Sequence, residues 1–93
     1  MTQLEAKIIV GLAENNLDVS PTARKLYMHR NTIMYHLRLI QRETRKNPRD
    51  FYDMCDLLPM ARQVLALGVD ERTMKALETM GERVHGGGDN ADA

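Results

Sequence analysis

The sequence predicts an all-α fold, a compact bundle of about five helices. Its length of 93 residues fits one small domain with a modest hydrophobic core. Helix-forming residues such as Met, Leu, Ala, Arg and Glu dominate, and Gly and Pro are sparse before residue 86. The β-branched residues never gather into an alternating run, so we expect no strand.

The first predicted helix begins at Thr2, because Thr2 and Glu5 have the spacing of a capping box. Its apolar residues recur at helical spacing and form one stripe, made of Leu4, Ile8, Ile9, Leu12 and Ala13. Asn15 and Asn16 favour an end of this helix, since Asn tolerates left-handed backbone geometry.

A short second helix follows, with Ser20 as its cap and Pro21 at its first helical position. We expect Ala23 and Leu26 to face inward. The residues up to His29 leave room only for a tight turn.

The third predicted helix runs from His29 or Arg30 to about Arg45, and it has two unlike faces. Its inner face carries Ile33, Leu37, Ile40 and Thr44 at steps of four, three and four residues. Its opposite face carries Asn31, Tyr35, Arg38 and Arg42, flanked by Met34 and Leu39, which we expect to be exposed. The predicted core of this helix pair is Ala23, Leu26, Ile33, Leu37 and Ile40.

Asn47 and Pro48 predict the start of a fourth helix. Its predicted inner stripe is Phe51, Met54, Cys55 and Leu58. Pro59 is expected to kink or break it, because proline lacks a backbone donor and crowds the preceding turn. A helical stretch over residues 60–67 then ends at Gly68.

Asp70 is expected to cap a last helix, whose apolar positions are Met74, Leu77, Met80 or Gly81, and Val84. The sequence therefore divides into residues 1–58, a helix-turn-helix domain, and residues 59–84, a helical extension and candidate dimerisation element. Residues 85–93 are predicted to be a disordered tail, since they are polar and glycine-rich.

The net charge is zero, but the charges are unevenly distributed along the chain. Between residues 22 and 49 a single acidic residue, Glu43, stands among eight basic ones, which are Arg24, Lys25, Arg30, Arg38, Arg42, Arg45, Lys46 and Arg49. The rest of the chain holds five basic and twelve acidic residues. A phosphate backbone responds to such a local positive field, although two ordinary solvated faces of opposite sign are the alternative.

A short helix, a tight turn and a longer helix with a polar outer face form the pattern of a helix-turn-helix that reads the major groove of double-stranded DNA. Helix pairs with short turns also occur in plain bundles, so this pattern is moderately specific. The run SPTARKLYMHRNTIMYHLRLIQRET is more informative. It closely resembles the C-terminal helix-turn-helix domain of the PucR-type and sugar-diacid-type bacterial transcription regulators.

The resemblance covers roughly residues 4–58, and its most specific part is residues 29–32, followed by Tyr35, Leu37, Arg38 and Ile40. It implies a Fis-like helical fold, sequence-specific DNA binding and a homodimer or larger assembly. Members of that family usually carry a ligand-sensing region before this domain. This chain begins at the domain itself, so the effector of a family member cannot be carried over to it, and no small-molecule ligand is expected.

The predicted DNA contacts are His29, Arg30, Asn31, Thr32, Tyr35, Arg38, Arg42, Arg45 and Lys46. Asn31 suits an adenine edge and Arg38 a guanine, while the last three suit phosphates without sequence preference. Several have structural alternatives: His29 as a helix cap, Thr32 bonded to a carbonyl of its own helix, and Tyr35 packed as a rim aromatic.

A second hypothesis is a protein-interaction adaptor that keeps the fold and pairs with another regulator instead of binding DNA. It is motivated by Met34, His36 and Leu39, which stand where the family often has basic residues. Fewer phosphate contacts predict weaker and less salt-sensitive DNA binding, and exposed apolar residues would suit a protein partner.

Nothing in the sequence predicts an enzyme, a metal site or a cofactor. Cys55 lies on an apolar stripe and is expected to be an inert core thiol, and one cysteine suits a reducing, cytoplasmic location. His29, His36 and His85 are too far apart to form a ligand cluster. No segment is long and apolar enough to predict a membrane span.

Overall fold

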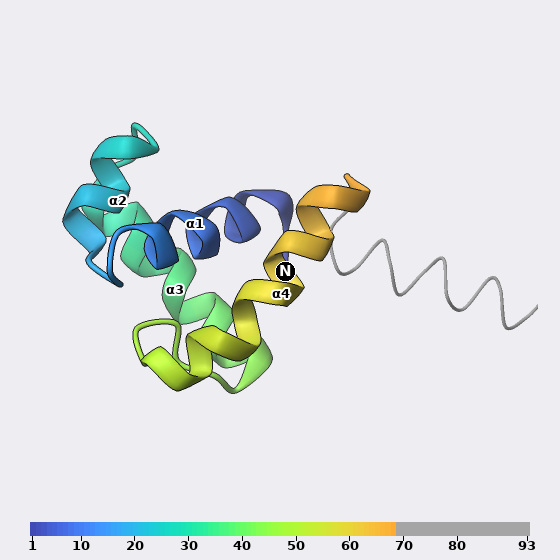
Figure 1. The fold of residues 1–93 in the computed structure, drawn as a ribbon. Helices are drawn as coiled ribbons and strands as arrows, with labels where there is room; N and C mark the ends of the chain where they lie inside the picture. The colour runs from blue at the N-terminus through green and yellow to red at the C-terminus, as the bar shows by residue number, and fades with distance from the viewer. Residues whose placement is uncertain (69–93) are drawn as a thin grey trace, which may run out of the picture.

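The computed structural model describes residues 1–68, and this part of the chain is all-helical, with four helices and no strand. The helices are α1 (Gln3–Glu14), α2 (Val19–Lys25), α3 (Arg30–Thr44) and α4 (Phe51–Leu67). As Figure 1 shows, α2 and α3 lie together at one side of α1, while α4 packs along the other. The predicted last helix over residues 70–84 and the predicted tail over 85–93 lie outside the described residues.

The capping box predicted for α1 is confirmed. The Glu5 amide donates a hydrogen bond to Thr2 Oγ1 (3.1 Å), and the Thr2 amide donates one to Glu5 Oε1 (2.9 Å). The helix ends at Asn15, whose side-chain amide donates to the Gly11 carbonyl (2.7 Å), and Asn16 then adopts a left-handed conformation. Both ends of α1 are therefore encoded locally.

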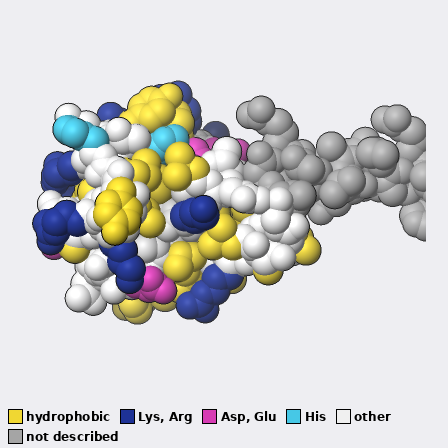
Figure 2. All heavy atoms as spheres, turned by 90° about the horizontal axis from the view of Figure 1, so that it is seen from above, with side chains coloured by type: hydrophobic (Ala, Val, Ile, Leu, Met, Phe, Trp, Pro, Cys, Tyr) yellow, Lys and Arg dark blue, Asp and Glu magenta, His cyan; other side chains and the backbone are white. Residues whose placement is uncertain are grey.

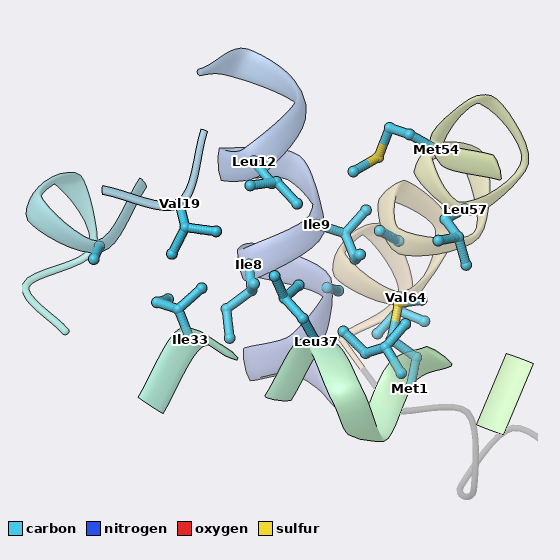
Figure 3. Packing of buried hydrophobic residues seen from close by; sticks show 14 residues of the cluster. Met1, Ile8, Ile9, Leu12, Val19, Ile33, Leu37, Met54, Leu57 and Val64 are labelled. Carbon is cyan, nitrogen blue, oxygen red and sulfur yellow. The ribbon is translucent and has the colours of Figure 1, made fainter. Parts of the chain in front are cut away.

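One predicted core position of α1 is wrong, because Leu4 is 41% exposed. Ala6 is fully buried. The structure turns α1 so that Ile9 points toward α4, while Ile8 points toward α3, as Figure 3 shows. The buried surface of α1 is therefore set by α3 on one side and α4 on another, so it is not a single stripe.

The α2 helix starts two residues earlier than predicted. Asp18 is the N-cap, and its side chain accepts a hydrogen bond from the Ser20 amide (3.3 Å), so Val19 is the first helical residue and Ser20 is not the cap. At Gly11 the backbone of α1 comes close to this helix, since a Cβ there would lie 3.3 Å from Thr22 Cγ2. This close approach positions α2 against α1.

The turn between α2 and α3 is tight, as predicted. The Met28 amide donates to the Ala23 carbonyl (2.9 Å), and Tyr27 takes a left-handed conformation with φ 57°. The next helix, α3, begins at Arg30 and ends at Thr44, where Arg45 is left-handed. The predicted bounds of α3 are confirmed to within one residue.

The inner face of α3 is buried as predicted. Ile33 and Ile40 are fully buried and Leu37 is nearly so, and Figure 3 shows Ile33 and Leu37 directed toward Ile8. Of the two α2 positions predicted to join them, Ala23 is buried and Leu26 is half-buried against the same core. The helix pair is therefore anchored through one face of α3.

The predicted start of α4 is wrong, and its predicted buried stripe is only partly right, since Met54 is buried and Leu58 half-buried while Phe51 and Cys55 are exposed. Asp50, and not Asn47, is the N-cap, with its carboxylate accepting from the Asp53 amide (3.0 Å). Phe51 is 63% exposed and Cys55 is exposed, so Cys55 is not a core thiol. The buried stripe is instead Met54, Leu57, Ala61 and Val64.

Pro59 lies inside α4 and does not break it, since the helix continues from Phe51 to Leu67. Because Pro59 is exposed, the carbonyl group that loses its helical donor lies on the solvent side, where water can satisfy it. The two predicted helical stretches on either side of Pro59 are therefore one helix. It ends at Gly68, which has φ 72°, as the sequence predicts.

Candidate nucleic-acid interface

The outer face of α3 is an exposed polar surface of the helix pair. Asn31, Tyr35, Arg38 and Arg42 are all exposed on this face. Their opposite neighbours on the same helix are buried against α1 and α2, so α3 is held by its apolar half. The predicted separation of the two faces is therefore present in the structure.

The start of α3 combines a cap with exposed polar residues. His29 is the N-cap, and its Nδ1 accepts a hydrogen bond from the Asn31 amide (3.1 Å), which agrees with the capping alternative. Arg30, Asn31 and Thr32 are exposed beside it. Within the described part of the chain, no carbonyl accepts a hydrogen bond from the Thr32 hydroxyl, which is therefore available to an outside partner.

Tyr35 points outward from the middle of α3 and is 53% exposed. Its ring meets that of His36 edge to face, with the centroids 5.4 Å apart. His36 itself is half-buried, with Nδ1 3.7 Å from Glu5 Oε2, so it faces α1 and not solvent. This position therefore does not join the outer face.

Met34 and Leu39, expected to be exposed, are half-buried. The Met34 sulfur lies 4.0 Å from Arg49 Nη1. These residues consequently do not form an open apolar patch, and the adaptor hypothesis loses the surface that motivated it.

Four of the predicted arginine contacts are exposed and carry no carboxylate partner among residues 1–68. They are Arg30, Arg38, Arg42 and Arg45. Unpaired guanidinium groups keep their full charge and their donors for an outside anion.

Lys46 differs from these arginines, because Asp56 of α4 binds it. Their side chains are 3.0 Å apart, and the hydrogen bond and negative charge of Asp56 raise the pKa of Lys46 above its usual value. Lys25 of α2 likewise lies 3.9 Å from Glu14. Two of the eight basic residues are therefore partly neutralised, which the charge count alone does not show.

Arg49 belongs to the same basic surface, although the spacing along α3 did not place it there. It is exposed in the loop before α4 and packs beside Met34. The feature of the sequence that could have identified Arg49 was the excess of basic residues up to position 49. Figure 2 shows one face of the molecule on which Lys and Arg side chains lie among hydrophobic and His side chains, with few acidic groups.

A short helix, a four-residue turn from Leu26 to His29, and a longer helix anchored by its apolar face define a helix-turn-helix. The sequence comparison gives the family. Residues 8–60 match the PucR C-terminal helix-turn-helix domain, and the chain belongs to this family. The resemblance predicted from residues 4–58 is thus confirmed.

No curated protein and no solved structure matches the chain. The Fis-like character of the fold therefore stays a prediction. Within residues 1–68, no helix is long and apolar enough to cross a membrane. The same residues contain no group of three or more His, Cys, Asp or Glu side chains placed to hold a metal ion.

Proposed function

We propose that this chain is a transcription regulator that binds double-stranded DNA by placing the outer face of α3 in the major groove. The observation that carries this proposal is the set of exposed arginines that have no carboxylate partner within residues 1–68, on a helix whose opposite face is buried. A helix held in this way presents fixed donors to base edges and phosphates.

The position of each side chain supports a different role. Arg30 and Asn31 lie in the first turn of α3, the part of a reading helix that approaches base edges most closely. Arg38 lies about two turns further and suits a guanine. Arg42 and Arg45, at the far end, suit phosphates, while the Asp56 contact makes Lys46 the weakest contributor.

The test is a titration of the purified protein against mixed-sequence duplex DNA by fluorescence anisotropy at two salt concentrations. We expect Arg38→Ala to weaken binding by roughly 5- to 150-fold, which corresponds to about 1–3 kcal/mol. Arg42→Ala is expected to lower the salt slope by about 1. The matched control is Arg62→Ala, an exposed arginine of α4 outside this surface.

Equal affinities for the wild type, Arg38→Ala and Arg62→Ala would contradict the placement of α3 in the groove. Selection of tight binders from a random library then tests sequence specificity. An enriched palindromic site supports a regulator, whereas the absence of any enriched site would leave only non-specific binding.

We also propose that the protein acts as a homodimer, because two modules on half-sites one helical turn apart bind more tightly than one. The proposed dimer element remains residues 59–84. Ala61 and Val64 are used inside the chain's own core, which leaves Leu67, exposed at the end of α4, and the residues after Gly68 for contacts with a second copy. Light scattering over a range of concentrations measures the oligomeric state, and a monomer throughout would contradict the dimer.

A further inference from the structure

Two hollows lie beside α1 and α4, and we refer to them together as the groove; no residue of α3 lines either of them. The larger hollow has a volume of about 380 Å³ and lies between the end of α1 and the start of α4, lined by Ala13, Asn16, Leu17, Phe51, Met54, Cys55 and Leu58. A smaller hollow of about 160 Å³ lies where α1, the end of α2 and α4 meet, lined by Lys7, Val10, Gly11, Glu14, Lys25, Leu26 and Leu65. Most of this surface is apolar, and Phe51 at its far end is 63% exposed.

The groove residues of α4 form a second stripe beside the buried one. Phe51, Cys55 and Leu58 follow one another at helical spacing on the flank of α4 next to its core face, and the stripe then passes through the exposed Arg62 to Leu65. Such a stripe is what a further helix packs against. Nothing within residues 1–68 covers it.

We propose that residues 70–84 of the same chain dock into this groove as an amphipathic helix, antiparallel to α4. The apolar residues Met74, Leu77, Gly81 and Val84 recur at helical spacing and would form the docking face. The inference is independent of DNA binding, because none of the groove residues belongs to α3.

The length of the chain beyond Gly68 supports this occupant. Along α4, Phe51 and Leu65 are about 21 Å apart, and a helix over residues 70–84 is about 22 Å long. Gly68 ends α4 in a left-handed conformation, and Asp70 is a favourable cap for a new helix, so a short connection reverses the chain. Val84 and Phe51 are about equally far from Gly68 along the chain, so Val84 reaches the Phe51 end of the groove in the docked hairpin.

The charges of the groove and of the docked segment also favour the antiparallel direction. At the Leu65 end of the groove Glu14 is paired with Lys25, and the exposed Lys7 adds a positive charge where the docked segment begins with Asp70 and Glu71. The attachment of the segment to α4 also gives it a high effective concentration at its own groove, which favours it over the same segment of a second copy. A dimer then forms between such hairpins, without exchange of the segments.

The chain's single cysteine, Cys55, lines the groove and reports whether it is covered. The experiment measures the rate at which a soluble disulfide reagent modifies Cys55 in the full chain. Leu77→Asp places a charge on the docking face, and the matched control Thr79→Asp places the same charge on the opposite face of the segment. We expect Leu77→Asp to increase the rate of Cys55 modification by on the order of tenfold, which is the change expected if the groove is covered about nine-tenths of the time and then becomes open. Thr79→Asp should change this rate by less than about twofold.

A second measurement uses disulfide formation and does not depend on destabilising the segment. Val84→Cys is expected to form a disulfide with Cys55 inside one chain under mild oxidation, while Thr79→Cys is not, because the partner cysteines must approach within about 7 Å of each other between their Cα atoms. Equal reaction rates for all variants, or no disulfide for Val84→Cys, would overturn the proposal. A disulfide only between two chains would overturn docking on the same chain in favour of a second copy.

The DNA titration separates this inference from the proposed function. Leu77→Asp is expected to leave DNA affinity within about twofold of wild type, since the groove does not involve α3. Protection of Cys55 in a protein that does not bind DNA would support the docked segment and contradict only the DNA-binding proposal. Loss of DNA affinity in Leu77→Asp, with Thr79→Asp unchanged, would overturn the independence claimed for the groove.

Discussion

The two longest helices, α3 and α4, have 15 and 17 residues and distribute their side chains in opposite ways. In α3, the buried residues Ile33, Leu37 and Ile40 share one face and arginines occupy the other. In α4, apolar side chains lie on several sides, since Leu57 is fully buried while Phe51 and Tyr52 are exposed.

This difference decides how much freedom each helix has in its packing. A helix with one apolar face has one orientation that buries it, and α3 adopts that orientation. Turning α4 about its axis would bury a different but comparably apolar set, so its neighbours select the side. In the structure the choice is made by α1, whose Ile9 lies opposite Leu57 and Met54 (Figure 3).

The largest expected effect tests which side of α4 is buried. Leu57→Ala removes a fully buried side chain and should lower the free energy of unfolding by about 2–5 kcal/mol. Cys55→Ala, on the exposed side predicted from sequence to be buried, should cost less than about 1 kcal/mol. Urea denaturation followed by circular dichroism measures both, and similar losses for the two variants would contradict the observed orientation.

A smaller effect tests where α4 begins. Asp50→Ala removes the side chain that accepts a hydrogen bond from the Asp53 amide and should cost about 1 kcal/mol of stability. Asp50→Asn keeps an acceptor at the same place and should cost only a few tenths of that. If the two variants are equally destabilised, Asp50 acts through its charge and not as a cap.

The turn before α3 contains a left-handed residue, Tyr27. Tyr27 is 97% exposed and left-handed, a conformation that costs an L-residue roughly 1–2 kcal/mol. Tyr27→Gly should therefore be more stable than Tyr27→Ala by about 0.5–1 kcal/mol, after the greater flexibility of unfolded glycine is subtracted. Thermal unfolding of both proteins makes this comparison, and greater stability of the Ala variant would show that the turn changes conformation.

The smallest expected effect concerns the ion pair between the α3–α4 loop and α4. Asp56 raises the pKa of Lys46 above its usual value, which already lies well above neutral pH, so Asp56→Asn frees an ammonium that stays charged. If the proposed function is right, DNA affinity should rise by less than about threefold at low salt and by less at high salt, where screening is stronger. Asp56→Glu, which keeps the charge, is the control, and an unchanged affinity for Asp56→Asn would place Lys46 away from DNA.

The sequence alone determined the features that depend on residues close together in the chain. The capping box at Thr2, the end of α4 at Gly68 and the inner face of α3 all follow from local hydrogen bonding and helical spacing, which left the His29 cap as one of two alternatives. The membership of the PucR C-terminal helix-turn-helix family was likewise visible, because residues 29–32 and the positions that follow form a local motif.

The tertiary structure decided the features that depend on residues far apart in the chain. It left Leu4 and Cys55 exposed, kept α4 continuous through Pro59, turned His36 toward Glu5 and gave Lys46 a partner in Asp56. The physical reason is common to all of them. Side-chain burial and charge pairing depend on which helix faces which, and spacing along one helix carries no information about its neighbours.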